Sequence, residues 1–236
     1  MTGRLLLTFD DRHVASWLAA RPLFDDVDAE VTFFIMEADL LDDDERAGLQ
    51  TLLADGHAVG SHGARHRNAD ETIREHGADG YLAIEVDPSI RVLQEIGASA
   101  RSFAYPNSRR DDTSDRVLLA RFDRLRTGGR RTTDRELAVR TIVPSDAIPR
   151  VLPSRGSDTG RGDQVHPADA DTMSFLLRET AERDGVLVLY AHDIAAQSAF
   201  NHIDPDRLAD ILREARHLGL SMQGFDRLPT PEGTPS

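Results

Sequence analysis

The stretch Arg4-Leu5-Leu6-Leu7-Thr8-Phe9-Asp10-Asp11 places three consecutive leucines, then Thr8 and Phe9, before two adjacent carboxylates. A continuous apolar run, without alternation, is typical of a strand buried on both faces of a parallel sheet. A second run of this kind, from Val186 to Tyr190, ends just before His192 and Asp193. Because ligands bind beyond the carboxyl ends of parallel strands, both ends are candidate positions for a functional site.

Working outward from these runs, apolar clusters alternate with segments of helical periodicity, which predicts βα units and a parallel sheet. A chain of 236 residues fits one domain of this type. We expect further strands at Ala29–Met36, His57–Ser61, Arg101–Tyr105, Phe122–Thr127, Leu137–Val143 and Leu218–Gly224. We expect helices at Val14–Leu23, Asp43–Ala54, Ala83–Gly97, Asp112–Arg121, Ala168–Arg183 and Asp204–His217.

Glycine, proline and polar residues mark the ends and interruptions of these elements. Gly56, Gly97 and Gly219 each follow a predicted helix, where a left-handed cap residue is expected. Ser154–Asp163 is rich in Gly, Ser and Asp and predicts a long loop. Residues 228–236 predict a disordered tail, so the folded domain is expected to span residues 1–227.

The composition excludes several classes of partner and site. The chain carries 41 acidic and 28 basic residues, a formal net charge of −13, which makes nucleic acid an unsuitable partner. It has no cysteine, so any transition metal must be held by His and carboxylate ligands. No apolar stretch is long enough for a membrane span, and the N-terminal run is too short for a signal peptide. We therefore expect a cytoplasmic location.

All 28 basic residues are arginine, because the sequence contains no lysine. Two explanations remain open at this point. A GC-rich genome favours arginine codons, whereas a salt-adapted surface tolerates many carboxylates because high salt screens their repulsion.

Four motifs lie at predicted strand ends. The first is Asp10-Asp11, whose mutual repulsion a bound cation would relieve, although Asp before a helix can also act as an N-cap. The second, His62-Gly63-Ala64-Arg65-His66, spaces two imidazoles so that they can reach one metal ion. Gly63 stands where the zinc-protease motif has Glu, which disfavours that class and, with Gly60 and Ser61, indicates a tight turn.

The other two motifs supply candidates for polar catalysis. In Phe103-Ala104-Tyr105-Pro106-Asn107, the proline ends a strand and leaves the Asn107 backbone amide as a candidate oxyanion donor. In Leu189-Tyr190-Ala191-His192, a histidine ends a buried strand. A histidine of this kind is commonly structural, but its position matches that of the other three motifs.

Taken in order, the four motifs resemble the polysaccharide deacetylase family, also called carbohydrate esterase family four. The resemblance runs from about Leu5 to Gly224, and it includes Thr32-Phe33-Phe34, the segment from Gly56 to His62, and Leu125-Arg126-Thr127. It implies a single-domain, distorted (β/α) barrel of about seven parallel strands. It also implies hydrolysis of the N-acetyl (or O-acetyl) group of an amino sugar, oligosaccharide or polysaccharide.

The resemblance assigns a role to each motif residue. Asp11, His62 and His66 become ligands of one divalent metal, zinc by default, with cobalt, nickel and manganese as alternatives. Asp10 becomes the general base, His192 the general acid, and the Asn107 amide a donor to the oxyanion. The implied partner is an acetylated carbohydrate; the sequence gives no prediction of oligomeric state.

The sequence departs from the family pattern at two places. Many members carry an arginine that pairs with the base, two residues before the proline of the third motif, where this chain has Ala104. Arg140 is the predicted replacement. Many members also carry a Trp and an Asp that orients the acid histidine. Here Trp17 is in a different place, and Asp158 or Asp163 is the candidate orienting residue.

Two alternatives to deacetylation remain. One is a ring-amide hydrolase of the allantoinase type on the same scaffold. The other is a carbohydrate-binding protein without activity, which the retention of Asp10, Asp11, His62, His66 and His192 argues against. Few aromatic residues are available to stack on sugar rings, so we expect a small soluble substrate rather than a wall polymer.

Overall fold

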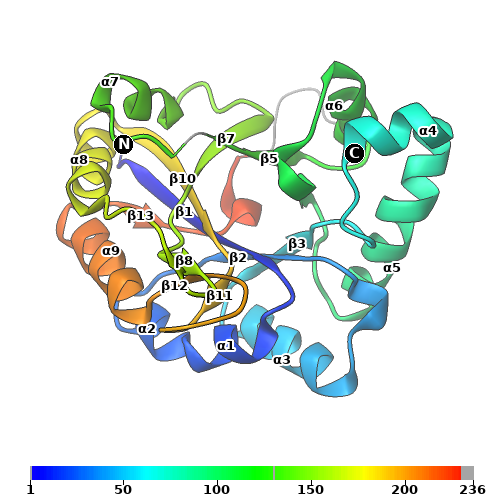
Figure 1. Cartoon of the computed structure of the whole chain (residues 1–236), viewed down its shortest axis with the longest axis horizontal. Coiled ribbons are helices and arrows are strands. Elements are labelled where there is room, and N and C mark those ends of the chain that lie inside the picture. The colour runs from blue at the N-terminus through cyan, green and yellow to red at the C-terminus, as the bar shows by residue number, and fades with distance from the viewer. Residues whose placement is uncertain (1, 130, 230–236) are drawn as a thin grey trace.

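Seven parallel strands form the centre of the protein in the computed structural model, which describes residues 2–129 and 131–229. Each strand pairs in parallel with the next, and β10 pairs back with β1, so that the sheet closes into a barrel. This confirms the predicted (β/α) barrel. The strands are β1 (Arg4–Asp11), β2 (Thr32–Ile35), β3 (Ala58–Ser61), β4 (Ser102–Ala104), β5 (Arg124–Gly128), β7 (Val151–Gly156) and β10 (Gly185–Ala191) (Figure 1).

Helices surround the barrel, as Figure 1 shows. They begin where the sequence offers caps: the Asp42 side chain accepts from Glu45 N in a capping box, and Asp204 caps a helix that starts with Pro205. Gly56, Gly97 and Gly219 have φ of 95°, 95° and 71°, as expected of residues that follow helices. The α-helices are α1 (Val14–Ala19), α2 (Arg21–Asp25), α3 (Asp43–Ala54), α4 (Ala69–Tyr81), α5 (Asp87–Glu95), α6 (Asp112–Leu119), α7 (Arg135–Ala138), α8 (Ala170–Glu182) and α9 (Pro205–His217).

Strand β1 explains how the core and the site share one element. Leu5, Leu7 and Phe9 belong to the large apolar cluster between the barrel and its helices, whereas Leu6 belongs to a smaller cluster. Because side chains alternate along a strand, Asp10 lies on the same face as Leu6. The strand is therefore buried on both faces, as its sequence predicts.

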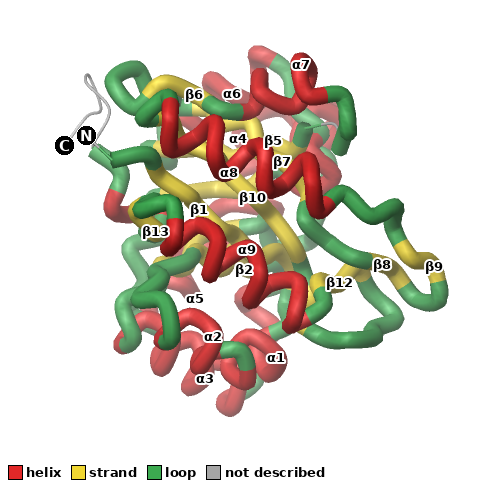
Figure 2. Tube along the Cα trace, turned by 90° about the vertical axis from the view of Figure 1, so that its left-hand side faces the viewer, coloured by secondary structure: helices red, strands yellow, loops and turns green. Residues whose placement is uncertain are grey.

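Short strands extend the barrel and build a second sheet. β6 (Val143–Pro144) pairs antiparallel with β10, and β13 (Ser221–Met222) pairs with β1. β11 (Asp193–Ile194), β12 (Asn201–Ile203), β8 (Gly160–Arg161) and β9 (Gln164–Val165) form a separate sheet in that order. Figure 2 shows β8 and β9 projecting from the barrel beside β12.

Several expected elements differ in the structure. The segment expected as a strand at Leu137–Val143 is mostly α7 and a 3-10 turn (Val139–Thr141), whereas the sixth barrel strand is β7. The predicted loop at Ser154–Asp163 therefore begins inside β7 and contains β8. Helix α4 was not predicted, and a π-helical turn (Leu82–Val86) joins it to α5.

The predicted tail is wrong for its first two residues. Leu228 is buried in the smaller apolar cluster, and the Pro229 carbonyl accepts a hydrogen bond from Arg124. Residues 230–236 lie outside the described residues. No helix in the described part of the chain is long and apolar enough to cross a membrane.

Candidate active site

The four sequence motifs meet in one cavity of about 340 Å³ at the carboxyl ends of the strands. The lining residues come from β1, β5, β8, β10, β12, the loops after β3 and β4, and the residue between β10 and β11. They are Asp10, Asp11, His62, His66, Tyr105, Asn107, Ser108, Arg126, Arg161, Tyr190, His192 and Asn201. The structure thus brings together six of the seven residues that the sequence proposed; Arg140 lies elsewhere.

Asp11, His62 and His66 converge in a geometry that could hold a metal ion. Asp11 Oδ1 lies 3.7 Å from His62 Nε2 and 3.6 Å from His66 Nε2, and the candidate ligand atoms all lie within 4.8 Å of one another. Ligand atoms about 2.1 Å from a tetrahedral zinc ion are separated by about 3.4 Å, so the three groups fit a shared cation. One carboxylate and two imidazoles would leave positions open for water and substrate.

His62 is prepared for ligation by its surroundings. Its Nδ1 lies 2.8 Å from the Ala104 carbonyl oxygen, and donation of the Nδ1 proton to that oxygen leaves the Nε2 lone pair directed towards Asp11. Burial lowers the pKa of His62 to about 4, despite the opposing charges of Asp10 and Asp11. The imidazole is therefore neutral near pH 7, the form that binds metal.

A buried glutamate from the π-helical turn holds the loop that carries both histidines. Glu85 is 0% exposed, and its Oε2 accepts from the backbone N–H of Arg65 at 3.0 Å and of Arg67 at 3.4 Å. Its backbone carbonyl accepts from Ala64 N at 2.9 Å. Gly63 has φ of 81°, and a Cβ there would lie 2.5 Å from Glu85 Oε2, so the close approach requires glycine. π-Helical turns are frequent at functional sites.

Asp10 pairs with Arg126, not with Arg140. The Arg126 guanidinium donates to Asp10 Oδ2 in a pair that is almost completely buried. Burial raises the pKa of Asp10, but Arg126 with His62 and His192 outweighs it, so the pKa lies below its usual value. Arg140 is exposed in the turn that follows α7, because the segment predicted as a strand is helical.

The register of the sheet explains the substitution of Arg126 for the family arginine. Ala104 on β4 and Arg126 on β5 are direct neighbours across the two strands. The Arg126 guanidinium therefore reaches the Asp10 carboxylate from β5, the strand next to the one that carries Ala104. Its plane packs near the Tyr190 ring, 4.8 Å from the centroid, and near Phe34.

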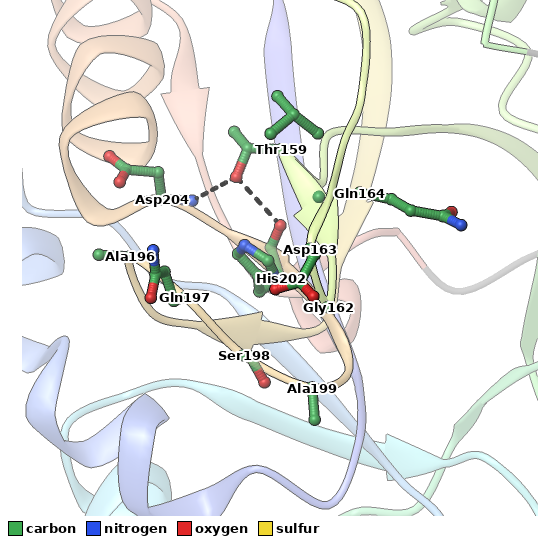
Figure 3. A pocket seen from close by; sticks show the side chains of 12 residues that line it. Thr159, Gly162, Asp163, Gln164, Ala196, Gln197, Ser198, Ala199, His202 and Asp204 are labelled. Carbon is green, nitrogen blue, oxygen red and sulfur yellow. Dashed lines mark hydrogen bonds between the residues drawn. The ribbon is translucent and has the colours of Figure 1, made fainter.

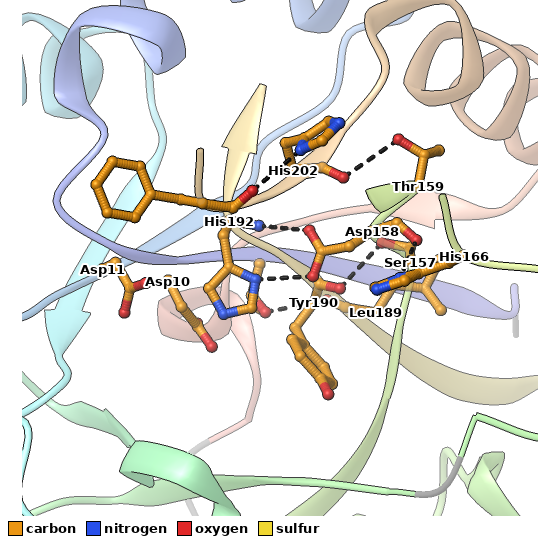
Figure 4. A network of polar contacts seen from close by, with 12 residues as sticks. Asp10, Asp11, Ser157, Asp158, Thr159, His166, Leu189, Tyr190, His192 and His202 are labelled. Carbon is orange, nitrogen blue, oxygen red and sulfur yellow. Dashed lines mark hydrogen bonds and ion pairs between the residues drawn. The ribbon is translucent and has the colours of Figure 1, made fainter. Parts of the chain in front are cut away.

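His192 lies between Asp158 on one side and Asp10 and Asp11 on the other, as Figure 4 shows. Asp158 accepts from His192 Nδ1 at 2.8 Å and from its backbone N–H at 3.1 Å, which resolves the choice between Asp158 and Asp163. Burial lowers the pKa of His192, but Asp158, Asp10 and Asp11 outweigh it and raise the pKa to about 9. Trp17 Nε1 donates to the His192 carbonyl at 2.9 Å, so the single Trp supports this strand end.

Backbone strain is concentrated around the cavity. Asp11, His66, Asn107 and Ser108 have φ of 79°, 53°, 52° and 56°, values that non-glycine residues seldom adopt, and all four line the cavity. Such strain persists where function needs a particular side-chain or amide direction. The Asn107 side chain donates to Asn68 Oδ1 at 3.0 Å, which holds this turn against the segment before α4.

Some functional candidates were not assigned from sequence. Arg126 and Glu85 gave a detectable signal, because a charged residue in a predicted buried strand or helix face needs a partner. Arg161 and Asn201 gave none, since they reach the cavity from strands that were not predicted.

These features define a class: a (β/α) barrel with a buried aspartate–arginine pair, an Asp-His-His group and an aspartate-oriented histidine at the strand ends. The sequence profile of the polysaccharide deacetylases matches residues 2–121. The chain therefore belongs to the polysaccharide deacetylase family. This agrees with the resemblance drawn from the four motifs. No curated protein matches the chain by sequence.

Solved structures of such enzymes share the fold. The polysaccharide deacetylase Bc1974 from Bacillus cereus is 18% identical, with a TM-score of 0.57 over 94% of this chain and 92% of that one. The peptidoglycan deacetylase PdaC from Bacillus subtilis is 15% identical, with a TM-score of 0.57 over 96% and 90%. PdaA from Bacillus subtilis, a family 4 carbohydrate esterase, is 11% identical, with a TM-score of 0.56 over 96% and 80%.

Proposed function

We propose that this protein is a metal-dependent deacetylase that hydrolyses the N-acetyl group of an amino sugar or of an oligosaccharide containing one. The observation that supports this most strongly is the arrangement of two adjacent carboxylates with different partners. Asp10 pairs with Arg126, whereas Asp11 faces His62 and His66. One carboxylate is thereby suited to take a proton and the other to bind a cation.

A second observation concerns the Asp10 oxygen that does not contact Arg126. Asp10 Oδ1 is buried and has no hydrogen-bond partner among the described residues, while Oδ2 receives Arg126. An unpaired buried oxygen of an ionised carboxylate is costly unless a donor such as water reaches it. Asp11, His62 and His66 would hold the ion, which would lower the pKa of a water and polarise the substrate carbonyl.

The protein's own groups then divide the proton transfers. Asp10 Oδ1 accepts a proton from the attacking water, and Arg126 keeps this carboxylate ionised and fixed. The Asn107 backbone N–H donates to the carbonyl oxygen as negative charge develops on it. His192, held by Asp158 at Nδ1, donates the Nε2 proton to the leaving nitrogen, which departs as the free amine.

Matched variants of the two carboxylates test this division. Asp10→Asn should retain the metal and lose activity by roughly 10²–10⁴-fold, because only the base is removed. Asp11→Asn and His66→Ala should lose the metal as well. Metal content is measured by elemental analysis, and activity by acetate release from N-acetylated monosaccharides, sugar conjugates and chitin oligomers.

The same experiment can reject the proposal. Equal metal content in Asp10→Asn and Asp11→Asn would show that the roles are wrongly divided. The parent protein is also assayed after loading with zinc, cobalt, nickel or manganese. If none of these forms releases acetate from any substrate of the panel, deacetylation is rejected. Ring-opening of a cyclic amide by these forms would then favour the allantoinase-like alternative.

A further inference from the structure

One positively charged side chain in the catalytic cavity has no role in the chemistry described above. Arg161 lines the cavity from β8, and no ion pair or hydrogen bond links its guanidinium to any residue that the structure describes. The other arginine of the cavity, Arg126, is bound to Asp10. Arg161 is exposed, and no carboxylate of the described residues balances its guanidinium, although the chain has a net charge of −13.

The strand that carries Arg161 is fixed rather than loose. Arg161 pairs with Asn201 across β8 and β12, and Gly162 N donates to the Ser198 carbonyl at 2.9 Å. The Thr159 hydroxyl donates to the His202 carbonyl and accepts from Asp204 N, contacts that Figure 3 shows. These bonds tie the hairpin to the segment that follows β10.

Alternation along the paired strands directs Arg161 towards the chemistry. The Arg161–Asn201 pair lines the catalytic cavity, whereas the neighbouring Gly160–His202 pair lines a second cavity of about 790 Å³. Successive side chains of a strand point to opposite faces, so β8 forms a wall between the two cavities. Arg161 is thus presented on the catalytic side by its position in the sheet.

The charges of the loaded site do not cancel. Asp10 is neutralised by Arg126, and a protonated His192 is neutralised by Asp158. A divalent ion bound by Asp11 would leave a net charge of about +1 in the cavity, and Arg161 would raise that net charge to about +2. No acidic residue other than Asp10 and Asp11 lines the described cavity. A cavity of one sign on a protein of the opposite sign concentrates ligands of complementary charge.

We propose that Arg161 selects substrates in which the N-acetylated sugar carries an anionic substituent, a carboxylate or a phosphate. The guanidinium would bind the anion through paired N–H donors, while Asn201 would offer an amide beside it. This inference rests on the proposed deacetylase activity and adds the charge of its substrate. A neutral sugar would leave the exposed Arg161 guanidinium without an anionic partner.

Matched substrates that differ by one anion test the proposal on the metal-loaded full chain. One pair is di-N-acetylchitobiose and the disaccharide in which one sugar is N-acetylmuramic acid, which adds a carboxylate. The other is N-acetylglucosamine and its 6-phosphate. We expect kcat/KM to favour the anionic member of at least one pair by about tenfold, mainly through KM, because a charged hydrogen bond contributes roughly this much. The pair that responds identifies carboxylate or phosphate.

Variants then assign the preference to this residue. Arg161→Gln should reduce the anionic preference to about one, and Arg161→Lys should retain part of it because the charge remains. Arg140→Gln, an exposed arginine outside the cavity, should keep the full preference. Added salt should weaken the preference of the parent protein.

The outcomes separate this inference from the proposed function. Acetate release with equal kcat/KM for both members of both pairs would overturn the selection of anions and leave the deacetylase activity in place. An anionic preference that persists in Arg161→Gln would also overturn it. Absence of acetate release from all four substrates and from the wider panel would reject the deacetylase function, and this inference with it.

Discussion

The part of the chain up to residue 121 and the part after it contribute differently to the site. The first part, which the family profile matches, supplies Asp10 and Asp11 from the end of β1, and His62, His66 and Asn107 from the loops after β3 and β4. The second part supplies Arg126, Asp158 and His192, and it adds the small sheet that carries Arg161. The three groups that could bind a metal ion therefore lie in the first part, whereas Arg126, Asp158 and the proposed selecting residue Arg161 lie in the second.

The largest expected effect comes from breaking the pair that joins the two parts. Arg126→Met would leave the Asp10 carboxylate buried without its cation, and loss of one partner of a buried ion pair costs about 3–5 kcal/mol. Arg140→Met, which changes an exposed residue, should change the free energy of unfolding by less than about 0.5 kcal/mol. Urea unfolding measures both. Similar urea midpoints for the two variants would contradict the assignment of Arg126.

The second prediction concerns the contribution of the later part to acid catalysis. Asp158→Asn removes the charge that raises the pKa of His192 to about 9, so the pKa should fall towards or below the ordinary 6.5. Nuclear magnetic resonance of the metal-free protein measures this pKa. Deacetylation by the metal-loaded variant should be slower by roughly 4–30-fold near pH 7, because a pKa between about 5.5 and 6.5 leaves only about 3–24% of His192 protonated.

The same variant changes how stability depends on pH. A pKa that is raised on folding contributes stability below the unfolded value of about 6.5, and this contribution is lost as pH rises through about 9. The stability difference between the parent and Asp158→Asn should therefore be greatest below pH 6.5 and shrink between pH 6.5 and 9. A difference that grows over this range would contradict the role of Asp158; Asp163→Asn, on the exposed hairpin turn, is the control.

The success of the sequence prediction follows the apolar pattern of each element and not this division of the chain, since α4 in the first part was not predicted and β10 in the second part was. Strands with continuous apolar runs, such as Leu5–Leu7 in β1, could be predicted because burial on both faces leaves no other pattern. The sixth barrel strand, β7, was missed because half of its sequence Val-Leu-Pro-Ser-Arg-Gly lacks large apolar residues and it contains a proline. Its polar residues have partners: Arg155 is buried against Asp169, and Ser154 donates to the Thr127 carbonyl.

The site was predictable where ligands lie close in sequence and not where pairing crosses strands. His62 and His66 are four residues apart, so their proximity is a local property of one loop. The Asp10–Arg126 pair depends on which strand lies next to β4. For His192 the sequence left Asp158 and Asp163 as alternatives, because the strands β7 and β8 on either side of Asp158 were not predicted. Long-range pairs of this kind are fixed by register, which a single sequence does not show.

The third prediction addresses the support of the metal loop in the earlier part. Glu85→Gln keeps the shape of the side chain but weakens acceptance from the N–H groups of Arg65 and Arg67. Since outer groups that hold ligands commonly change metal affinity by 10–100-fold, we expect about a tenfold higher Kd for zinc, and a greater increase in Glu85→Ala. Competition with a chelator measures Kd. Glu75→Gln, on the exposed face of α4, is the control, and an equal Kd in both would exclude this role for Glu85.

The smallest expected effect comes from a single hydrogen bond between the two parts. Trp17→Phe keeps a ring stacked on Phe33 but removes the Nε1 donor to the His192 carbonyl. Loss of one such bond should cost about 1 kcal/mol in the free energy of unfolding. It should also lower kcat by less than about tenfold with KM nearly unchanged, because His192 would be held less firmly at the end of β10.

Thr180→Val provides the comparison for this variant. Thr180 is buried in α8 and donates one hydrogen bond to the Leu176 carbonyl, outside the lining of the catalytic cavity. Both substitutions should reduce stability by similar amounts, but only Trp17→Phe should reduce kcat. If Trp17→Phe lowers stability and leaves kcat equal to that of Thr180→Val, the bond supports the fold alone. The earlier part would then contribute to acid catalysis only through the charges of Asp10 and Asp11 that face His192.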